Sequence, residues 1–127
     1  MNPQGITIKV SPYTVKETID HLQAILQSNG VTIYARINQQ DELQKTGQVI
    51  LPLEFILFGN PKSGGPIMVE NPMAALDLPL KVIAWQGSDQ KVLVAYNSAA
   101  YIKERHSLSD HVSAPIDLDP LMIKVLG

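Results

Sequence analysis

The chain contains no cysteine among its 127 residues. Without thiols it can form no disulfide framework, no thiolate metal site and no cysteine nucleophile. Redox chemistry through sulfur is therefore excluded from the functions that this sequence can carry.

Charged residues are also scarce, at 17% of the chain against about 25% in an average soluble domain. Apolar residues make up 45%, which favours a compact chain with little disorder. The ten basic residues are scattered, and with twelve acidic residues they give a net charge of −2. Since nucleic-acid binding relies on a concentrated positive surface, we expect no nucleic-acid partner.

Long apolar runs are missing too. No window approaches the roughly 18 uninterrupted apolar residues of a membrane span. The first ten residues lack the basic start and the sustained apolar stretch of a secretory signal. We therefore expect a cytoplasmic protein without a membrane segment. The length predicts a single domain over residues 1–127.

A helix is predicted over residues 15–28. Thr14 and Glu17 have the spacing of a capping box, and Gly30 provides a stop signal after the last turn. Apolar residues recur within it at helical intervals, namely Val15, Ile19, Leu22 and Leu26.

Five strands are predicted from apolar patterns, over residues 6–10, 31–38, 53–58, 80–85 and 91–96. The first two alternate apolar and polar residues, so each should have one face toward the core and one toward water. In the second strand the inward residues are expected to be Val31, Ile33, Ala35 and Ile37. The last three are nearly unbroken apolar runs, and a hairpin is expected between the final two.

Shorter helices are expected between and after the strands. A polar segment over residues 39–47 suits a short exposed helix. Ser98 can cap a helix that runs to about His106, and Asp119 is placed as the N-cap of a last helix that begins at Pro120.

This order of elements favours an α+β fold, with one antiparallel sheet and helices packed on one face. The apolar middle strands would then leave a large apolar patch on the other face, which is unusual for a monomer. Phe55, Leu57, Ile83 and Trp85, or their alternates, would form this patch. Three structures could cover this patch: the C-terminal segment, a second copy of the chain, or a ligand in a concave sheet.

The segment FGNPKSGGPIM, residues 58–68, is the first candidate site. Its Asn-Pro pair favours a turn and its Gly-Gly pair permits positive φ, so consecutive amides could point into one concavity beside a lysine. Such a loop would hold an anion. The alternative is a plain reversal, since neither Walker A nor the dinucleotide fingerprint is present. The ligand-binding residues expected here are Asn60, Lys62, Ser63, Gly64 and Gly65.

A second candidate cluster lies in YNSAAYIKERHSLSDH, residues 96–111. Asn97, Arg105 and His106 would form a second polar rim, because Arg105 can fork onto a carboxylate or phosphate as well as complement the helix dipole. His106 and His111 lack the spacing of two ligands on one helix face, so no metal is expected.

The acidic residues are interpreted as structural. Asp77 is expected to close a turn, and if buried it needs a partner, for which Lys81 and Arg105 are the nearest candidates. Asp117 and Asp119 are better explained as cap residues than as a catalytic pair.

The chain resembles the domain-of-unknown-function 302 family, small bacterial and archaeal proteins. The resemblance lies in three ordered motifs, FGNPKSGGPIM, LDLPLKVIAW and VAYNSAAYIKERHSL, and in the region TVKETIDHLQAILQSNGVTIYARI, and it covers residues 6–108. It implies a fold similar to the TATA-box-binding-protein-like class, a β-α-β4-α arrangement with a curved antiparallel sheet, and members of the family can form homodimers. It implies no activity, so no catalytic residue is carried over.

We therefore predict a non-enzymatic homodimer that binds a small anionic or apolar ligand, or a partner, through its sheet face or strand-edge loops. No cofactor and no metal are predicted. The alternative hypothesis is an enzyme acting on a small anionic substrate, in which the glycine loop at residues 59–65 holds the anion and His106 is the general acid or base.

Overall fold

The structure of the protein, a computed structural model, describes residues 3–127. Its strands are β1 (Ile6–Ser11), β2 (Thr32–Asn38), β3 (Leu53–Gly59), β4 (Leu80–Gln86) and β5 (Val92–Asn97). Its helices are α1 (Val15–Ser28), α2 (Gln39–Gln44), α3 (Pro61–Glu70), α4 (Ala99–Arg105), α5 (Asp110–Ser113) and α6 (Asp119–Leu126), with short 3-10 turns η1 (Pro72–Leu76) and η2 (Ala114–Ile116). Among these described helices, none combines the length and apolarity that crossing a membrane requires.

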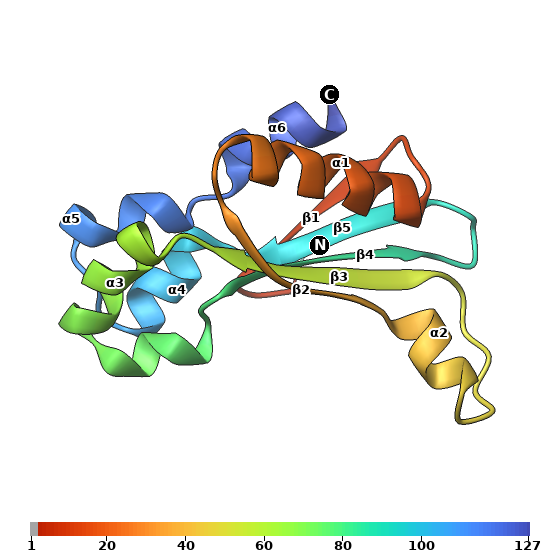
Figure 1. Ribbon diagram of the computed structural model, residues 1–127, viewed down its shortest axis with the longest axis horizontal. Coiled ribbons are helices and arrows are strands. Elements are labelled where there is room, and N and C mark those ends of the chain that lie inside the picture. The colour runs from red at the N-terminus through yellow and green to blue at the C-terminus, as the bar shows by residue number, and fades with distance from the viewer. Residues whose placement is uncertain (1–2) are drawn as a thin grey trace.

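The strands form one antiparallel sheet in the order β1-β5-β4-β3-β2. Strands β1 and β2 are the two edge strands, so α1 connects one edge of the sheet to the other (Figure 1). This arrangement is the expected α+β fold with the β-α-β4-α order, to which short helices are added. The predicted hairpin between β4 and β5 is also confirmed.

Helix α1 occupies the predicted residues because both halves of its capping box form. The Thr14 hydroxyl accepts a hydrogen bond from the Glu17 amide, and the Glu17 carboxylate accepts one from the Thr14 amide, each at 3.1 Å. After the helix, Gly30 takes a φ of 73°, which lets the chain turn toward β2.

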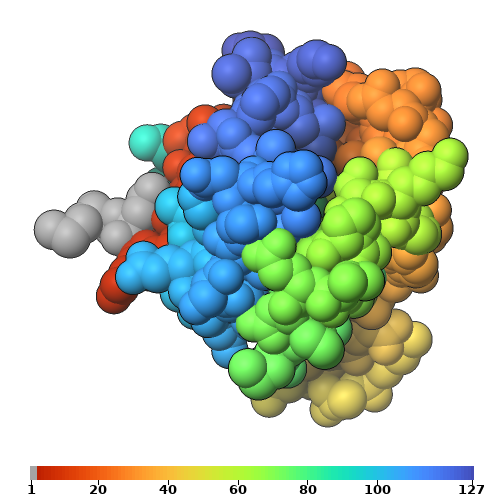
Figure 2. Space-filling view, turned by 90° about the vertical axis from the view of Figure 1, so that its left-hand side faces the viewer, coloured from red at the N-terminus to blue at the C-terminus, as the bar shows by residue number. Residues whose placement is uncertain are grey.

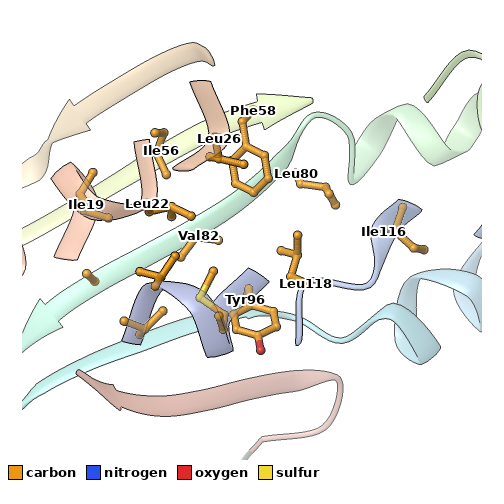
Figure 3. Close-up of a cluster of buried hydrophobic side chains, with 14 of the residues drawn as sticks. Ile19, Leu22, Leu26, Ile56, Phe58, Leu80, Val82, Tyr96, Ile116 and Leu118 are labelled. Carbon is orange, nitrogen blue, oxygen red and sulfur yellow. The ribbon is translucent and has the colours of Figure 1, made fainter. Parts of the chain in front are cut away.

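The core lies between α1, α6 and one face of the sheet (Figure 3). Met122 and Val125 of α6 are buried there beside α1, so the C-terminal segment covers the same face as α1 and not the opposite one. The predicted N-cap of α6 was wrong by one residue. Leu118 holds that position, and Asp119 instead accepts a hydrogen bond from the Tyr96 hydroxyl at 2.7 Å.

Strand β2 departs from its predicted alternation. Its register with β3 shifts between Ile33 and Ala35, as a β-bulge with Tyr34 as the extra residue would produce. Ile33 faces the core, whereas Ala35 and Ile37 lie on the other face. The prediction that these apolar residues share one face is therefore wrong, because one extra residue moves every later side chain to the opposite side.

The core-facing position after the bulge holds Arg36. Its guanidinium donates to Asp20 at 2.7 Å and to Glu54 at 3.1 Å, and so ties α1 to β3. The hydrogen bonds from Lys16 and then from Arg36 hold the pKa of the Asp20 carboxyl below its usual value. This network neutralises the buried carboxylate of Glu54, so the burial of these charged residues is explained without a bound ligand.

Away from its two ends, the second face of the sheet carries no helix within the described chain. Figure 1 shows α1 and α6 above the sheet, α2 below its right-hand end, and α3 and α4 beyond its left-hand end. The pairing register places mostly apolar residues on this open face: Ile6, Ile8, Val10, Thr32, Ala35, Ile37, Leu53, Phe55, Leu57, Gly59, Lys81, Ile83, Trp85, Leu93, Ala95 and Asn97. Val10 is 61% exposed, and Lys81, the one charged residue there, lies over the Phe55 ring at 4.6 Å.

Replacing the cap of α1 should destabilise the whole domain. We expect Thr14→Ala to lower the free energy of unfolding by about 1 kcal/mol, because the Glu17 amide loses its acceptor. Urea denaturation measures this loss. Thr14→Ser, which keeps the hydroxyl, should stay within about 0.5 kcal/mol of the wild type, and equal losses in both variants would contradict the role of the cap.

Candidate functional site

The segment over residues 58–68 is not the loop that its glycines suggested. Strand β3 ends at Gly59, Asn60 is the N-cap, and Pro61 opens the ten-residue helix α3. Gly64 and Gly65 lie inside this helix and do not take positive φ. The interpretation as a turn or glycine loop is therefore wrong, although Asn followed by Pro is a helix-start signal that could have identified α3.

The first turn of α3 offers no free amide. Pro61 has no N–H, and the Lys62 amide donates to the Asn60 side-chain oxygen at 3.0 Å. The amides of Ser63 and Gly64 donate to the Asn60 carbonyl at 2.9 and 2.8 Å. The amides of Lys62, Ser63 and Gly64, which were expected to face an anion, are thus occupied by Asn60.

A cavity of about 380 Å³ lies beside α3, at the end of the sheet where β3 finishes and β4 begins. Four stretches of chain that are distant in sequence enclose it, within residues 26–34, 58–68, 78–80 and 115–121. Figure 2 faces this end of the molecule and shows the end of α1 in orange, α3 in yellow-green and the C-terminal segment in blue around a common region. We call this space the sheet-end cavity.

The wall of the sheet-end cavity is mainly apolar. Its buried side chains are Leu26, Phe58, Ile67, Leu80, Ile116 and Leu118, joined by the partly buried Val31, Leu78 and Leu121. In Figure 3, Leu26, Phe58 and Leu80 lie next to one another although they come from α1, β3 and β4. Such a wall matches the usual chemistry of a small-molecule pocket.

A small set of polar side chains completes the lining: Asn29, Tyr34, Asn60, Ser63 and Asp117. Tyr34 is the extra residue of the β2 bulge and is 51% exposed. Its position in the bulge directs its ring toward the cavity at this end of the sheet. Asn29, Tyr34 and Asp117 were not predicted. The sequence identified residues 29–30 as the end of a helix, but it contained no signal that the C-terminal segment with Asp117 lies beside them.

The predicted site residues separate into three places. Asn60, Ser63 and Gly64 line the sheet-end cavity, whereas Lys62 and Gly65 belong to the same helix but do not line it. Asn97 lies on the open face beside Lys81, in a smaller hollow of about 150 Å³. The two residues expected beside it, Arg105 and His106, line neither space.

Arg105 and His106 instead bind the carboxylate of Asp77. The His106 Nε2 lies 2.6 Å from Asp77 Oδ2, and an Arg105 guanidinium nitrogen lies 3.1 Å from the same oxygen. The His106 residue is only 4% exposed, and its carbonyl accepts a hydrogen bond from the Asn71 side chain at 2.8 Å. Arg105 was a predicted partner for a buried Asp77, but the contact with His106 was missed. These bonds join α4 to the connection between α3 and β4.

Tyr96 shows the other buried polar contact near the site. Burial, and then the hydrogen bond to Asp119, raise the pKa of the Tyr96 hydroxyl above its usual value, so it stays protonated and donates. This bond holds the start of α6, and with it the stretch over residues 115–121, against β5. In the described chain no three His, Asp or Glu side chains gather as metal ligands.

Known proteins resemble this chain in sequence or in fold. The chain is 33% identical over 104 residues to proteins named fluoride-specific ion channel FluC 1 in Brucella suis biovar 1 (strain 1330) and Brucella abortus biovar 1 (strain 9-941). The match covers 82% of this chain but only 41% and 38% of those proteins. The chain therefore spans about two-fifths of the length of these curated relatives.

A solved structure gives the same picture of the fold. The crystal structure of an uncharacterized conserved protein DUF302 from Bacillus stearothermophilus superposes with a TM-score of 0.79 over 98% of this chain and 97% of its own, at 16% identity. The sequence profile of the family described as "Domain of unknown function DUF302" matches residues 6–121. The chain thus belongs to the DUF302 family.

Proposed function

We propose that this domain binds a small, largely apolar molecule in the sheet-end cavity. The observation that carries the proposal is the cavity itself, about 380 Å³ of space between apolar side chains of α1, β3, α3, β4 and α6. This volume lies within the range of about 300–1,000 Å³ that is typical of ligand pockets. A few polar groups at its margin, from Tyr34, Asn60 and Ser63, can fix the orientation of a bound molecule.

The geometry supports binding over the catalytic alternative. An enzyme of the kind considered above needs an anion-holding loop and His106 at one cavity. The amides of Lys62, Ser63 and Gly64 are already occupied, and the buried His106 side chain points to Asp77 and does not line the cavity. His106 and Asp77 are better explained as a structural pair that positions α4.

We further propose that two copies of the domain associate through the open face. The face is apolar apart from Thr32, Lys81 and Asn97, and away from α2 at one end no helix covers it in the described chain. An exposed apolar surface of this kind is unusual on a monomer, and its single cation offers nothing to a strongly charged partner. A second copy presents the same apolar surface, so a dimer with two-fold symmetry would bury the open face of both copies.

The names of the Brucella relatives describe proteins more than twice as long as the matched region. We propose the same ligand-binding role for the matched region of those proteins. We assign no ion conduction to this chain.

Filling the cavity should abolish binding of an apolar molecule. We expect the neutral fluorophore N-phenylnaphthylamine to bind one site per chain, and Gly64→Leu to weaken its Kd at least about tenfold. Gly64 lines the cavity in a helical conformation, so a side chain fits the backbone there. A fluorescence titration gives the Kd.

Gly65→Leu is the matched control, since Gly65 is the next residue of α3, does not line the cavity and has open space at its Cβ position. This variant should bind within about twofold of the wild type. Equal Kd values for the two leucine variants would contradict binding in this cavity.

A charge on the open face should separate the two copies. We expect the wild type to sediment as a dimer and Val10→Glu to sediment as a monomer, because a carboxylate would be desolvated at the interface. Val10 is 61% exposed in the single chain, so the substitution leaves the core intact. Val69→Glu, on α3 and 86% exposed, is the control that should remain dimeric. A wild type that stays monomeric at high concentration would refute the dimer.

Removing the imidazole of His106 should affect stability and leave binding unchanged. We expect His106→Ala to lower the free energy of unfolding by about 2 kcal/mol, because the Asp77 side chain, only 9% exposed, loses a hydrogen bond. The Kd for N-phenylnaphthylamine should not change. His111→Ala, at an exposed position of α5, should change the stability by less than about 0.5 kcal/mol. A weaker Kd with unchanged stability would favour a direct role of His106 in the site.

A further inference from the structure

The charges around the sheet-end cavity have one sign. Among its lining residues in the described chain, Asp117 is the one Asp, Glu, Lys, Arg or His. None of the lysine, arginine or histidine side chains of residues 3–127 lines the cavity, although Lys62 is only one residue from Ser63. A ligand that enters the cavity therefore meets a carboxylate and no cation.

The neutral donors of the site cannot replace a cation. The first-turn amides of α3 are occupied by Asn60, as described above. The polar groups that remain are the hydroxyls of Tyr34 and Ser63 and the side-chain amides of Asn29 and Asn60. These groups can bind an uncharged polar atom, but they leave the repulsion between Asp117 and an anionic ligand uncompensated.

Asp117 is held in place at the margin of the cavity. Its neighbours Ile116 and Leu118 are 1% and 6% exposed, so they anchor the backbone on both sides. One carboxylate oxygen accepts a hydrogen bond from the Asp119 amide at 3.1 Å, and within the described chain the other oxygen accepts none. The exposed side chain thus presents an unused acceptor beside an apolar space.

We infer that the ligand is a hydrophobic amine, with its apolar body in the cavity and its protonated nitrogen beside Asp117. The inference rests on the proposed binding function. It specifies the head group of an apolar ligand, and it replaces the anionic ligand that the sequence analysis considered. Apolar burial supplies most of the affinity, and the carboxylate supplies discrimination, because an exposed ion pair contributes only modestly.

Three ligands with the same chain and different head groups test the inference: octylamine, octanol and octanoate. Each is titrated against the wild-type chain with bound N-phenylnaphthylamine at neutral pH and low salt, and displacement gives its Kd. We expect octylamine, present as the ammonium ion, to bind about tenfold more tightly than octanoate, with octanol between them. In Asp117→Asn, which keeps an oxygen for the Asp119 amide, this ratio should fall to about twofold while the Kd of octanol stays unchanged.

Asp89→Asn is the matched control. The Asp89 side chain also accepts a hydrogen bond from the amide two residues later, at 3.1 Å, but it lies in the β4–β5 hairpin and does not line the cavity. This variant should keep the tenfold ratio. Equal Kd values for the three ligands in the wild type, tighter binding of octanoate, or an unchanged ratio in Asp117→Asn would overturn the inference while cavity binding stands. If N-phenylnaphthylamine itself does not bind, the proposed function fails and the inference fails with it.

Discussion

Helix α1 buries its apolar stripe against β3 and β4, and this contact decides which side of the sheet becomes the interior. Ile19, Leu22 and Leu26 are at most 3% exposed, and burial of each such side chain contributes about 2 kcal/mol. Helix α6 packs on the same side of the sheet, because its Met122 and Val125 side chains are buried beside α1. With both helices on one side, the other side of the sheet is left as an apolar surface.

The parts of the fold that follow from local signals were predictable. The capping box at Thr14 and Glu17, the cap at Ser98 and the apolar strand runs each depend on residues close together in the chain. The bulge in β2 was not predictable, because its alternating residues gave no sign of the register shift against β3. Helix α3 was missed for a different reason. Two glycines and Pro66 disfavour a helix, and tertiary contacts such as those of buried Ile67 outweigh that local preference.

The candidate site was only partly visible in the sequence for the same reason. Asn60, Ser63 and Gly64 belong to one conspicuous segment, and the structure places all three at the cavity. The opposite wall comes from residues 115–121, whose position depends on long-range contacts such as the hydrogen bond between Tyr96 and Asp119. His106 attracted attention as a titratable residue in a polar stretch. Its burial against Asp77 could not be read from sequence, because the two residues are 29 positions apart.

The composition of α3 has a thermodynamic consequence for the cavity that it borders. A glycine costs a helix about 1 kcal/mol relative to alanine, so Gly64 and Gly65 leave α3 with little intrinsic tendency to stay coiled. The helix is instead stabilised by the apolar contacts of residues such as Ile67, which is buried. Ile67 also lines the cavity in which the proposed ligand would bind. If a ligand binds as proposed, its contacts with Ile67 would stabilise the helical state of α3, and formation of α3 would in turn favour binding.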